Sequence, residues 1–213
     1  MNDMEDMLND ISKKDFEKQK YVELAISNPQ TRDFIVENMI NNSHIMKYYH
    51  CFDILEEVGS LKPELLYKYW DEIYKLLFHS NSYHRNFGLI LLAQLAKIDE
   101  ENKFIDIIDD YLNLLNDDRI MTAEACIKNV IKIASIKPEL SETVVDRLLD
   151  FENSIKYSEK QKAVIMSFLI EGFHLLYENF PKKDVLFKFV KKHIESISPK
   201  TRKVAKNFIN KYK

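Results

Sequence analysis

Glycine is scarce in this sequence. Only three of the 213 residues are glycine, whereas average usage would give roughly 15. Tight turns between β-strands use glycine at positive φ, and loops that cradle phosphate need several glycines close together. Gly59, Gly88 and Gly172 lie far apart along the chain. The shortage therefore argues against most β folds, Rossmann domains and P-loops.

Cysteine is also scarce, and long hydrophobic runs are missing. Cys51 and Cys126 are too far apart for a CxxC zinc pair and too few for a disulfide framework. The longest nearly apolar run, residues 87–96, is about half the length that spans a bilayer. The acidic residues 1–6 do not resemble the start of a signal peptide. We therefore expect a cytoplasmic protein without a membrane segment.

The composition is that of a folded chain whose charge is unevenly distributed. Apolar residues make up 46% and charged residues 31% of the sequence, which is enough for a substantial core in one domain. The net charge is −3, yet residues 182–213 hold 11 basic and 2 acidic residues, a net of +9, and the rest carries −12. Such a division can mark a surface for an anionic partner.

The five prolines mark the starts of helices. Each precedes an apolar pattern with a period near 3.6, and none lies inside such a pattern. Asn28 and Ser198 directly precede a proline, which is typical of an N-cap, and Ser158 with Gln161 forms a capping box. We predict helices at residues 30–41, 44–58, 64–79, 82–98, 101–115, 119–136, 139–153, 158–178, 182–196 and 199–212, with one or two more before residue 28.

Short segments of similar sequence recur at a regular spacing. Residues 60–65 (SLKPEL) recur as residues 135–140 (SIKPEL), an offset of 75. The leucine pair at 76 and 77 aligns with the pair at 114 and 115, an offset of 38. Both offsets are small multiples of about 38, which is the length of one predicted helix pair. Because one helix pair cannot bury its apolar face alone, such pairs must stack on one another.

A two-helix unit of this period resembles the HEAT/armadillo class of α-solenoids. The resemblance is clearest at residues 83–95 and 198–209, which look like the second helix of a HEAT unit. It implies an all-α fold, a right-handed α-α superhelix of about five HEAT-like helix pairs over residues 29–213. Residues 1–28 would form an N-terminal helical cap, and the whole would be a single domain.

Individual residues also match the HEAT pattern. Arg85 and Arg202 take the family's arginine position, and Gly88, Ala125 and Ala205 take its small position. The family favours an aspartate six residues before that arginine. This chain has a histidine (position 79) and a serine (position 196) there instead, so the aspartate ladder between repeats is not expected.

No constellation of residues predicts a catalytic site. His79 and His84 lie across a predicted loop, where polar surface at a helix junction is a better interpretation than a metal site. Cys51 and Cys126 occupy equivalent repeat positions, which favours small core residues over nucleophiles. Acidic clusters such as residues 99–101 are expected on solvated faces. We therefore expect no metal site, no cofactor and no enzymatic activity.

Aromatic residues crowd two neighbouring predicted helices. A mixed aromatic set of this kind could stack nucleic-acid bases. Helical spacing instead favours rings packed in the core with their hydroxyl groups at the rim. The residues concerned are Tyr48, Tyr49, Tyr67, Tyr69, Trp70 and Tyr74.

The basic last helix pair is the candidate binding surface. Second helices of HEAT solenoids usually line the concave side, so the resemblance implies that lysines of the last helix could face a groove and meet an acidic peptide or phosphates. A terminal helix pair kept in solution by its lysines is the alternative. The candidate partner-binding residues are Lys191, Lys192, Lys200, Arg202, Lys203 and Lys206.

Two functions follow as expectations. The first is a non-enzymatic scaffold that binds a partner protein through its concave or ridge surface. The alternative is a nucleic-acid-binding HEAT-like protein, related to the DNA-alkylation-repair glycosylases, that uses the basic C-terminal helix pair. That family uses Trp, Tyr and Asp in a basic channel. Here Trp70 is the single tryptophan, Asp71 follows it, and the chain is acidic overall, so we transfer no catalytic residue.

Overall fold

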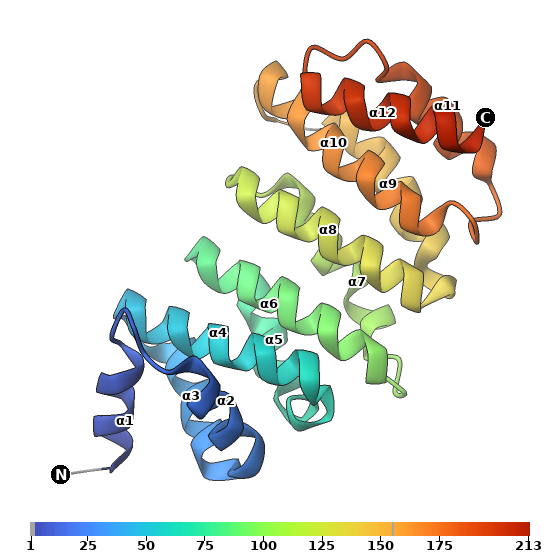
Figure 1. The fold of residues 1–213 in the computed structure, drawn as a ribbon. Helices are drawn as coiled ribbons and strands as arrows, with labels where there is room; N and C mark the ends of the chain where they lie inside the picture. Colours follow the sequence, from blue (N-terminus) through green and yellow to red (C-terminus); the bar gives the residue numbers. More distant parts are fainter. Residues whose placement is uncertain (1–2, 155) are drawn as a thin grey trace. The chain divides into compact units, whose positions relative to one another are not determined.

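The computed structural model describes residues 3–154 and 156–213, and these residues form helices and short connections without any β-strand. The expected all-α class is therefore confirmed. The chain divides into two compact units, residues 1–98 (unit 1) and residues 99–213 (unit 2). Each unit is described by itself below, with helices labelled as in Figure 1.

Unit 1 contains six α-helices. α4 lies at its centre and packs against α1, α2, α3 and α6. Residues before 28 therefore belong to the packed structure of unit 1, and the boundary expected at residue 28 stays a prediction. The helices are α1 (Asp3–Ile11), α2 (Lys18–Ser27), α3 (Pro29–Asn41), α4 (Ile45–Leu61), α5 (Trp70–Lys75) and α6 (Ser82–Leu95).

Unit 2 contains the other six α-helices of the described chain. Its longer helices lie side by side in Figure 1, where α8 packs against α10 and α10 packs against α12. These are the second helices of three successive predicted pairs. The helices are α7 (Lys103–Asn113), α8 (Ile120–Ile136), α9 (Ser141–Ser154), α10 (Glu159–Leu176), α11 (Lys183–Lys192) and α12 (Pro199–Tyr212).

The predicted continuous helix at residues 64–79 is wrong. This segment consists of three short 3₁₀ turns and the six-residue helix α5. Aromatic residues are only moderate helix formers because they lose side-chain freedom against the preceding turn. Tertiary contacts therefore decide the backbone here: Tyr69 and Trp70 are buried, and the Tyr69 hydroxyl donates a hydrogen bond to Asp33 of α3.

The predicted helix caps are confirmed. The side chain of Asn28 accepts hydrogen bonds from the backbone N–H groups of the second and third residues of α3. Ser158 and Gln161 form a capping box at the start of α10, and Ser198 caps α12. Each cap satisfies N–H groups that have no partner within the helix.

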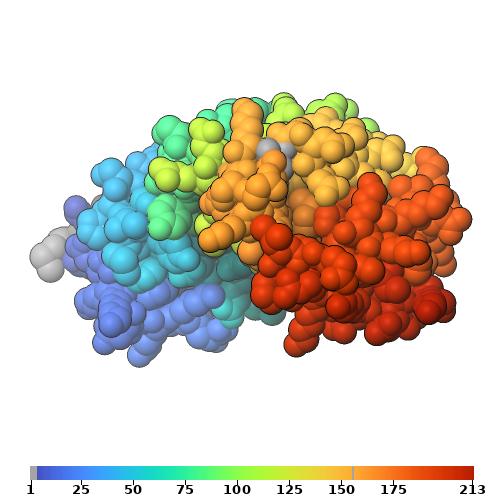
Figure 2. All heavy atoms as spheres, turned by 90° about the horizontal axis from the view of Figure 1, so that it is seen from above, coloured from blue at the N-terminus to red at the C-terminus, as the bar shows by residue number. Residues whose placement is uncertain are grey.

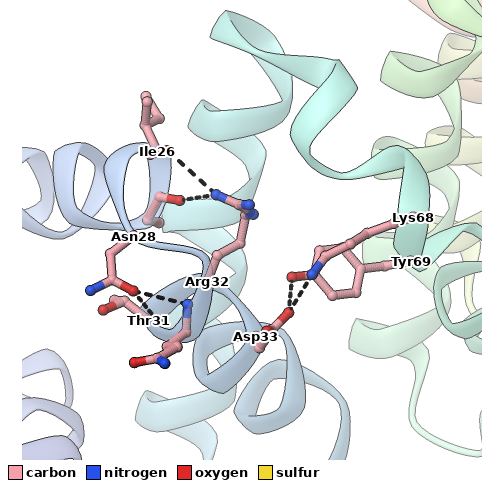
Figure 3. Close-up of polar contacts among 9 residues, drawn as sticks. Ile26, Asn28, Thr31, Arg32, Asp33, Lys68 and Tyr69 are labelled. Atoms are coloured by element: carbon pink, nitrogen blue, oxygen red, sulfur yellow. Dashed lines mark hydrogen bonds and ion pairs between the residues drawn. The ribbon is translucent and has the colours of Figure 1, made fainter.

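Arginine side chains fasten the connections within helix pairs. The Arg85 guanidinium donates to the carbonyl oxygen of His79 at 2.7 Å, and Arg202 donates to that of Ser196 at 2.7 Å. Arg32 makes the same kind of bond to the carbonyl oxygen of Ala25 at 2.7 Å, and Figure 3 shows Arg32 beside the Asn28 cap. At residues 79 and 196, backbone carbonyls thus accept these bonds where the HEAT pattern would have an aspartate.

Polar contacts between successive helix pairs join residues about 38 positions apart. In unit 1, Gln94 Nε2 donates to the Glu56 carbonyl oxygen at 2.9 Å, and in unit 2 the Thr201 hydroxyl donates to the Ala163 carbonyl oxygen. Both pairs are separated by 38 positions. The offset found in the sequence therefore corresponds to contacts between neighbouring helix pairs within each unit.

The acidic cluster at residues 99–101 lies only partly on a solvated face: its other two members are exposed as expected, but Asp99 is buried. Its carboxylate accepts backbone hydrogen bonds from Lys103 and Phe104, both at 2.9 Å, at the start of α7. Lys137 Nζ lies 3.2 Å from Asp99 Oδ2 and also donates to Asn102 Oδ1 at 3.1 Å. A buried carboxylate requires this compensation because desolvation penalises the charge.

Candidate functional site

The expected binding residues lie on the last helix pair of unit 2, whose surface is continuous in Figure 2 (red). Lys191 and Lys192 form the last turn of α11 and are exposed. Lys200, Lys203 and Lys206 are exposed along α12, one turn apart. Arg202 is only half-exposed, because its guanidinium is used to fasten the connection before α12. Arg202 therefore serves mainly to hold this connection in place, a role that the sequence did not predict.

Lys200 belongs to a mixed cationic and aromatic row that crosses three helices. Lys200 Nζ lies 4.0 Å from the ring centroid of Phe168 on α10, and Lys128 Nζ of α8 lies 4.5 Å from the same ring. Each lysine also pairs with an acid: Lys200 with Glu171 at 3.4 Å, and Lys128 with Glu124. Cation–π contacts and exposed ion pairs of this kind hold the lysines loosely.

Exposed apolar side chains lie on two of these three helices, α8 and α10. Met121 of α8 is 63% exposed, and Val164 and Leu175 of α10 are also exposed. The apolar period of the sequence did not identify these residues as exposed. Each belongs to a helix whose other face is also apolar, so exposed and buried apolar positions look alike in the sequence. Large exposed side chains of this kind, interspersed with lysine, are a common property of protein-binding surfaces.

An acidic cavity of about 390 Å³ adjoins the connection between α11 and α12. Three glutamates line it: Glu152 from α9, Glu159 from α10 and Glu195 from the connection. His193 is buried beside them, with Nε2 3.5 Å from Glu152 Oε1. Burial lowers the pKa of His193, and the nearby Glu152 opposes this effect. The sequence did not indicate this cavity, because its walls come from α9, from α10 and from the connection between α11 and α12.

The two cysteines and the histidine pair of residues 79 and 84 differ in how far their side chains are exposed. Cys51 and Cys126 are fully buried, as expected, and burial raises the pKa of Cys51 to about 12. His79 and His84 are stacked with ring centroids 4.2 Å apart. The expectation of polar surface is wrong for His84, which is 3% exposed because it packs against Tyr48. Among the described residues, no group of three or more His, Cys, Asp or Glu could hold a metal ion.

The crowded aromatic residues divide between core and surface. Tyr48, Tyr69 and Trp70 are buried, as expected, and Tyr67 and Tyr74 are half-buried. Tyr49 is the exception, because it is exposed on α4. Trp70 therefore has no free face on which a nucleic-acid base could stack.

No helix among residues 3–154 and 156–213 combines the length and the apolar character that crossing a membrane requires. This finding agrees with the expectation that the described chain has no membrane segment.

No protein-family model matches this chain, and no curated protein matches it either. A solved structure, described as the crystal structure of an engineered protein, is similar with a TM-score of 0.52. The match covers 99% of this chain and 96% of that chain at 15% sequence identity. A likeness at this identity concerns the fold alone.

Proposed function

We propose that this protein is a HEAT/armadillo-type α-solenoid that acts in the cytoplasm as a scaffold and binds an acidic partner protein. Two observations support the repeat assignment: contacts at an offset of 38 residues, and an arginine that fastens the connection within one helix pair of each unit. Stacked pairs of this kind present continuous rows of second helices, on which partners bind.

The exposed face of α8, α10 and α12 is the proposed binding surface, and its mixed character is the observation that carries the proposal. Lys128 and Lys200 flank the Phe168 ring, and Lys203 is exposed one turn further along α12. Met121 and Leu175, each seven residues along its helix from Lys128 or Phe168, add exposed apolar area. A partner segment with acidic and apolar side chains would replace the weak internal ion pairs and cover the apolar atoms.

Nucleic acid is the second candidate, favoured by the net charge of +9 over residues 182–213. Two observations make it weaker than the scaffold. The proposed surface includes Glu124 and Glu171, which would repel phosphates. Trp70 is buried, which argues against the base recognition used by the alkylation-repair glycosylases. Such a binder would act through phosphate neutralisation and would depend steeply on salt.

The test compares two charge-reversal variants of the full chain. One carries Lys200→Glu, Lys203→Glu and Lys206→Glu; the matched control reverses the exposed lysines Lys14, Lys75 and Lys97 in unit 1. Capture of partners from native extract, with and without nuclease, is compared with binding of a labelled polyglutamate peptide and a DNA duplex. Melting temperatures establish that both variants fold.

We expect the wild-type chain and the control to bind the acidic peptide and to retain nuclease-resistant partners, and the α12 variant to lose both. Equal loss of binding in the two variants would show that net charge alone causes the effect, and it would refute the proposed surface. If nuclease abolishes the capture of partners and the chain binds the duplex tightly, the nucleic-acid function is the correct one and the scaffold proposal is refuted.

A further inference from the structure

An exposed aromatic corner lies on α4 and α6 of unit 1. Tyr49 is 38% exposed and Tyr83 is 45% exposed. Their ring centroids are 5.9 Å apart, and the ring planes meet at 83°. The buried ring of Phe87 forms a third wall, 5.9 Å from Tyr49 at 72°. Two open rings at a right angle, backed by a third, leave π-faces available to a ligand.

The rings of the corner are held in place from behind. Phe87 is stacked on Phe52 with centroids 4.0 Å apart and an interplanar angle of 6°. Tyr83 lies in the first turn of α6, where its backbone N–H donates to the Asn81 cap at 3.0 Å. A ligand would therefore find the corner already formed, and little conformational entropy would be lost on binding.

Two carboxylates accompany the corner on α4. Asp53 and Glu56 follow Tyr49 by one and two helical turns, and both side chains are half-buried. Asp53 forms no hydrogen bond or ion pair among the described residues, and burial raises its pKa. Burial raises the pKa of Tyr49 too, and nearby Asp53, Tyr83 and Glu56 add to this effect. The corner is therefore an electronegative site without a cation of its own.

The cations that lie nearest to Asp53 have other partners. Lys18 lowers the pKa of Asp53, yet its Nζ pairs with Glu57 at 2.9 Å. His50 also lowers the pKa of Asp53, and its Nδ1 lies 2.6 Å from the carbonyl oxygen of Ile11. The charge of Asp53 thus stays only partly compensated within unit 1.

We propose that this corner, formed by Tyr49, Asp53, Glu56, Tyr83 and Phe87, binds an arginine or lysine side chain of a partner protein. The cation would lie against the two tyrosine faces, where the ring quadrupole attracts it. Asp53 and Glu56 would supply the opposite charge. Ile45, which is 48% exposed one turn before Tyr49, would cover the aliphatic part of the side chain.

The corner complements the proposed function but does not depend on it. It lies in unit 1 and selects positive charge, whereas the proposed scaffold surface lies in unit 2 and selects negative charge. Failure of either proposal leaves the other standing, because the two are tested with peptides of opposite charge.

A blocked tetra-arginine peptide, titrated into the full chain by calorimetry and by tyrosine NMR resonances, tests the proposal. We expect binding that shifts the Tyr49 and Tyr83 resonances. We expect Asp53→Asn and Tyr83→Ala each to weaken it about three- to ten-fold. Tyr83→Phe should retain most of the affinity because the π-face remains.

Two matched controls distinguish the corner from other acidic sites. Asp71→Asn removes an exposed carboxylate elsewhere in unit 1, and Glu195→Gln alters the acidic cavity of unit 2. Both controls should bind like the wild-type chain. Equal weakening by Asp71→Asn and Asp53→Asn, no response of the Tyr49 and Tyr83 resonances, or a shift of these same resonances by a DNA duplex added without the peptide would each overturn the proposal.

Discussion

Removal of the Lys137 side-chain charge is expected to destabilise the protein strongly. The side chain of Lys137 is 8% exposed, and that of Asp99 is fully buried. In Lys137→Met the buried Asp99 carboxylate would lose the cation of Lys137. Removal of one partner of a buried pair costs about 3–5 kcal/mol, and the two backbone N–H groups of Lys103 and Phe104 that still bind Asp99 place the cost near the lower end, about 3 kcal/mol.

The sequence itself offers a matched control for this substitution. Lys62 occupies the position of Lys137 in the recurring segment SLKPEL, but its side chain is 56% exposed and pairs with the exposed Glu64 at 4.0 Å. Lys62→Met makes the same chemical change on an exposed side chain. We expect it to alter stability by less than about 0.5 kcal/mol.

Thermal and urea unfolding, followed by far-ultraviolet circular dichroism, measure both variants. For a chain of this size about 3 kcal/mol corresponds to a fall of about 10 °C in melting temperature. The double variant Asp99→Asn with Lys137→Met should be less destabilised than the sum of the two single variants, because both substitutions remove the same buried ion pair. Equal melting temperatures for Lys137→Met and Lys62→Met would refute this reasoning.

Two further predictions concern the buried imidazole of His84 and a close contact between two helices at Gly172. Burial lowers the pKa of His84 to about 4, from about 6.5 when it is exposed. The unfolded chain therefore binds a proton more readily, and stability should fall by up to about 3 kcal/mol between pH 6.5 and 4. His84→Phe should flatten this slope in urea unfolding, and an unchanged slope would exclude His84 as the cause. A Cβ at Gly172 would meet Cδ1 of Ile131 at 2.1 Å, so Gly172→Ala should cost about 1–3 kcal/mol. Adding Ile131→Val, which removes that methyl group, should restore much of the melting temperature, and no restoration would refute the overlap as the cause.

Much of the local structure could be predicted because it depends on neighbours in the chain. Helix starts follow from Asn28, Ser158 and Ser198, whose side chains bind N–H groups two or three residues ahead. The helical class follows from the 3.6-residue apolar period. The prediction failed over residues 64–79, where the burial of aromatic side chains favours several short turns over one regular helix.

The candidate site was predicted only in part. Its lysines could be found because a cluster of like charge near the end of the chain is visible in the sequence. The structural use of Arg202 could not, since it depends on a backbone carbonyl six residues earlier that the folded connection turns back towards it. The acidic cavity and the aromatic corner were missed for a related reason: their walls come from different helices.

Most of the helices, their caps and a repeat of about 38 residues follow from the sequence alone, because these properties arise from interactions within one or two helical turns. What each repeated residue does depends on how the chain is folded. Lys62 and Lys137 share one motif, yet Lys137 lies against Asp99 and is buried, whereas Lys62 stays exposed. Tyr49 and Tyr83 likewise form a corner only because α4 packs against α6. A side chain's burial, charge and partners are set by the helix packed against it, and that neighbour comes from another part of the chain.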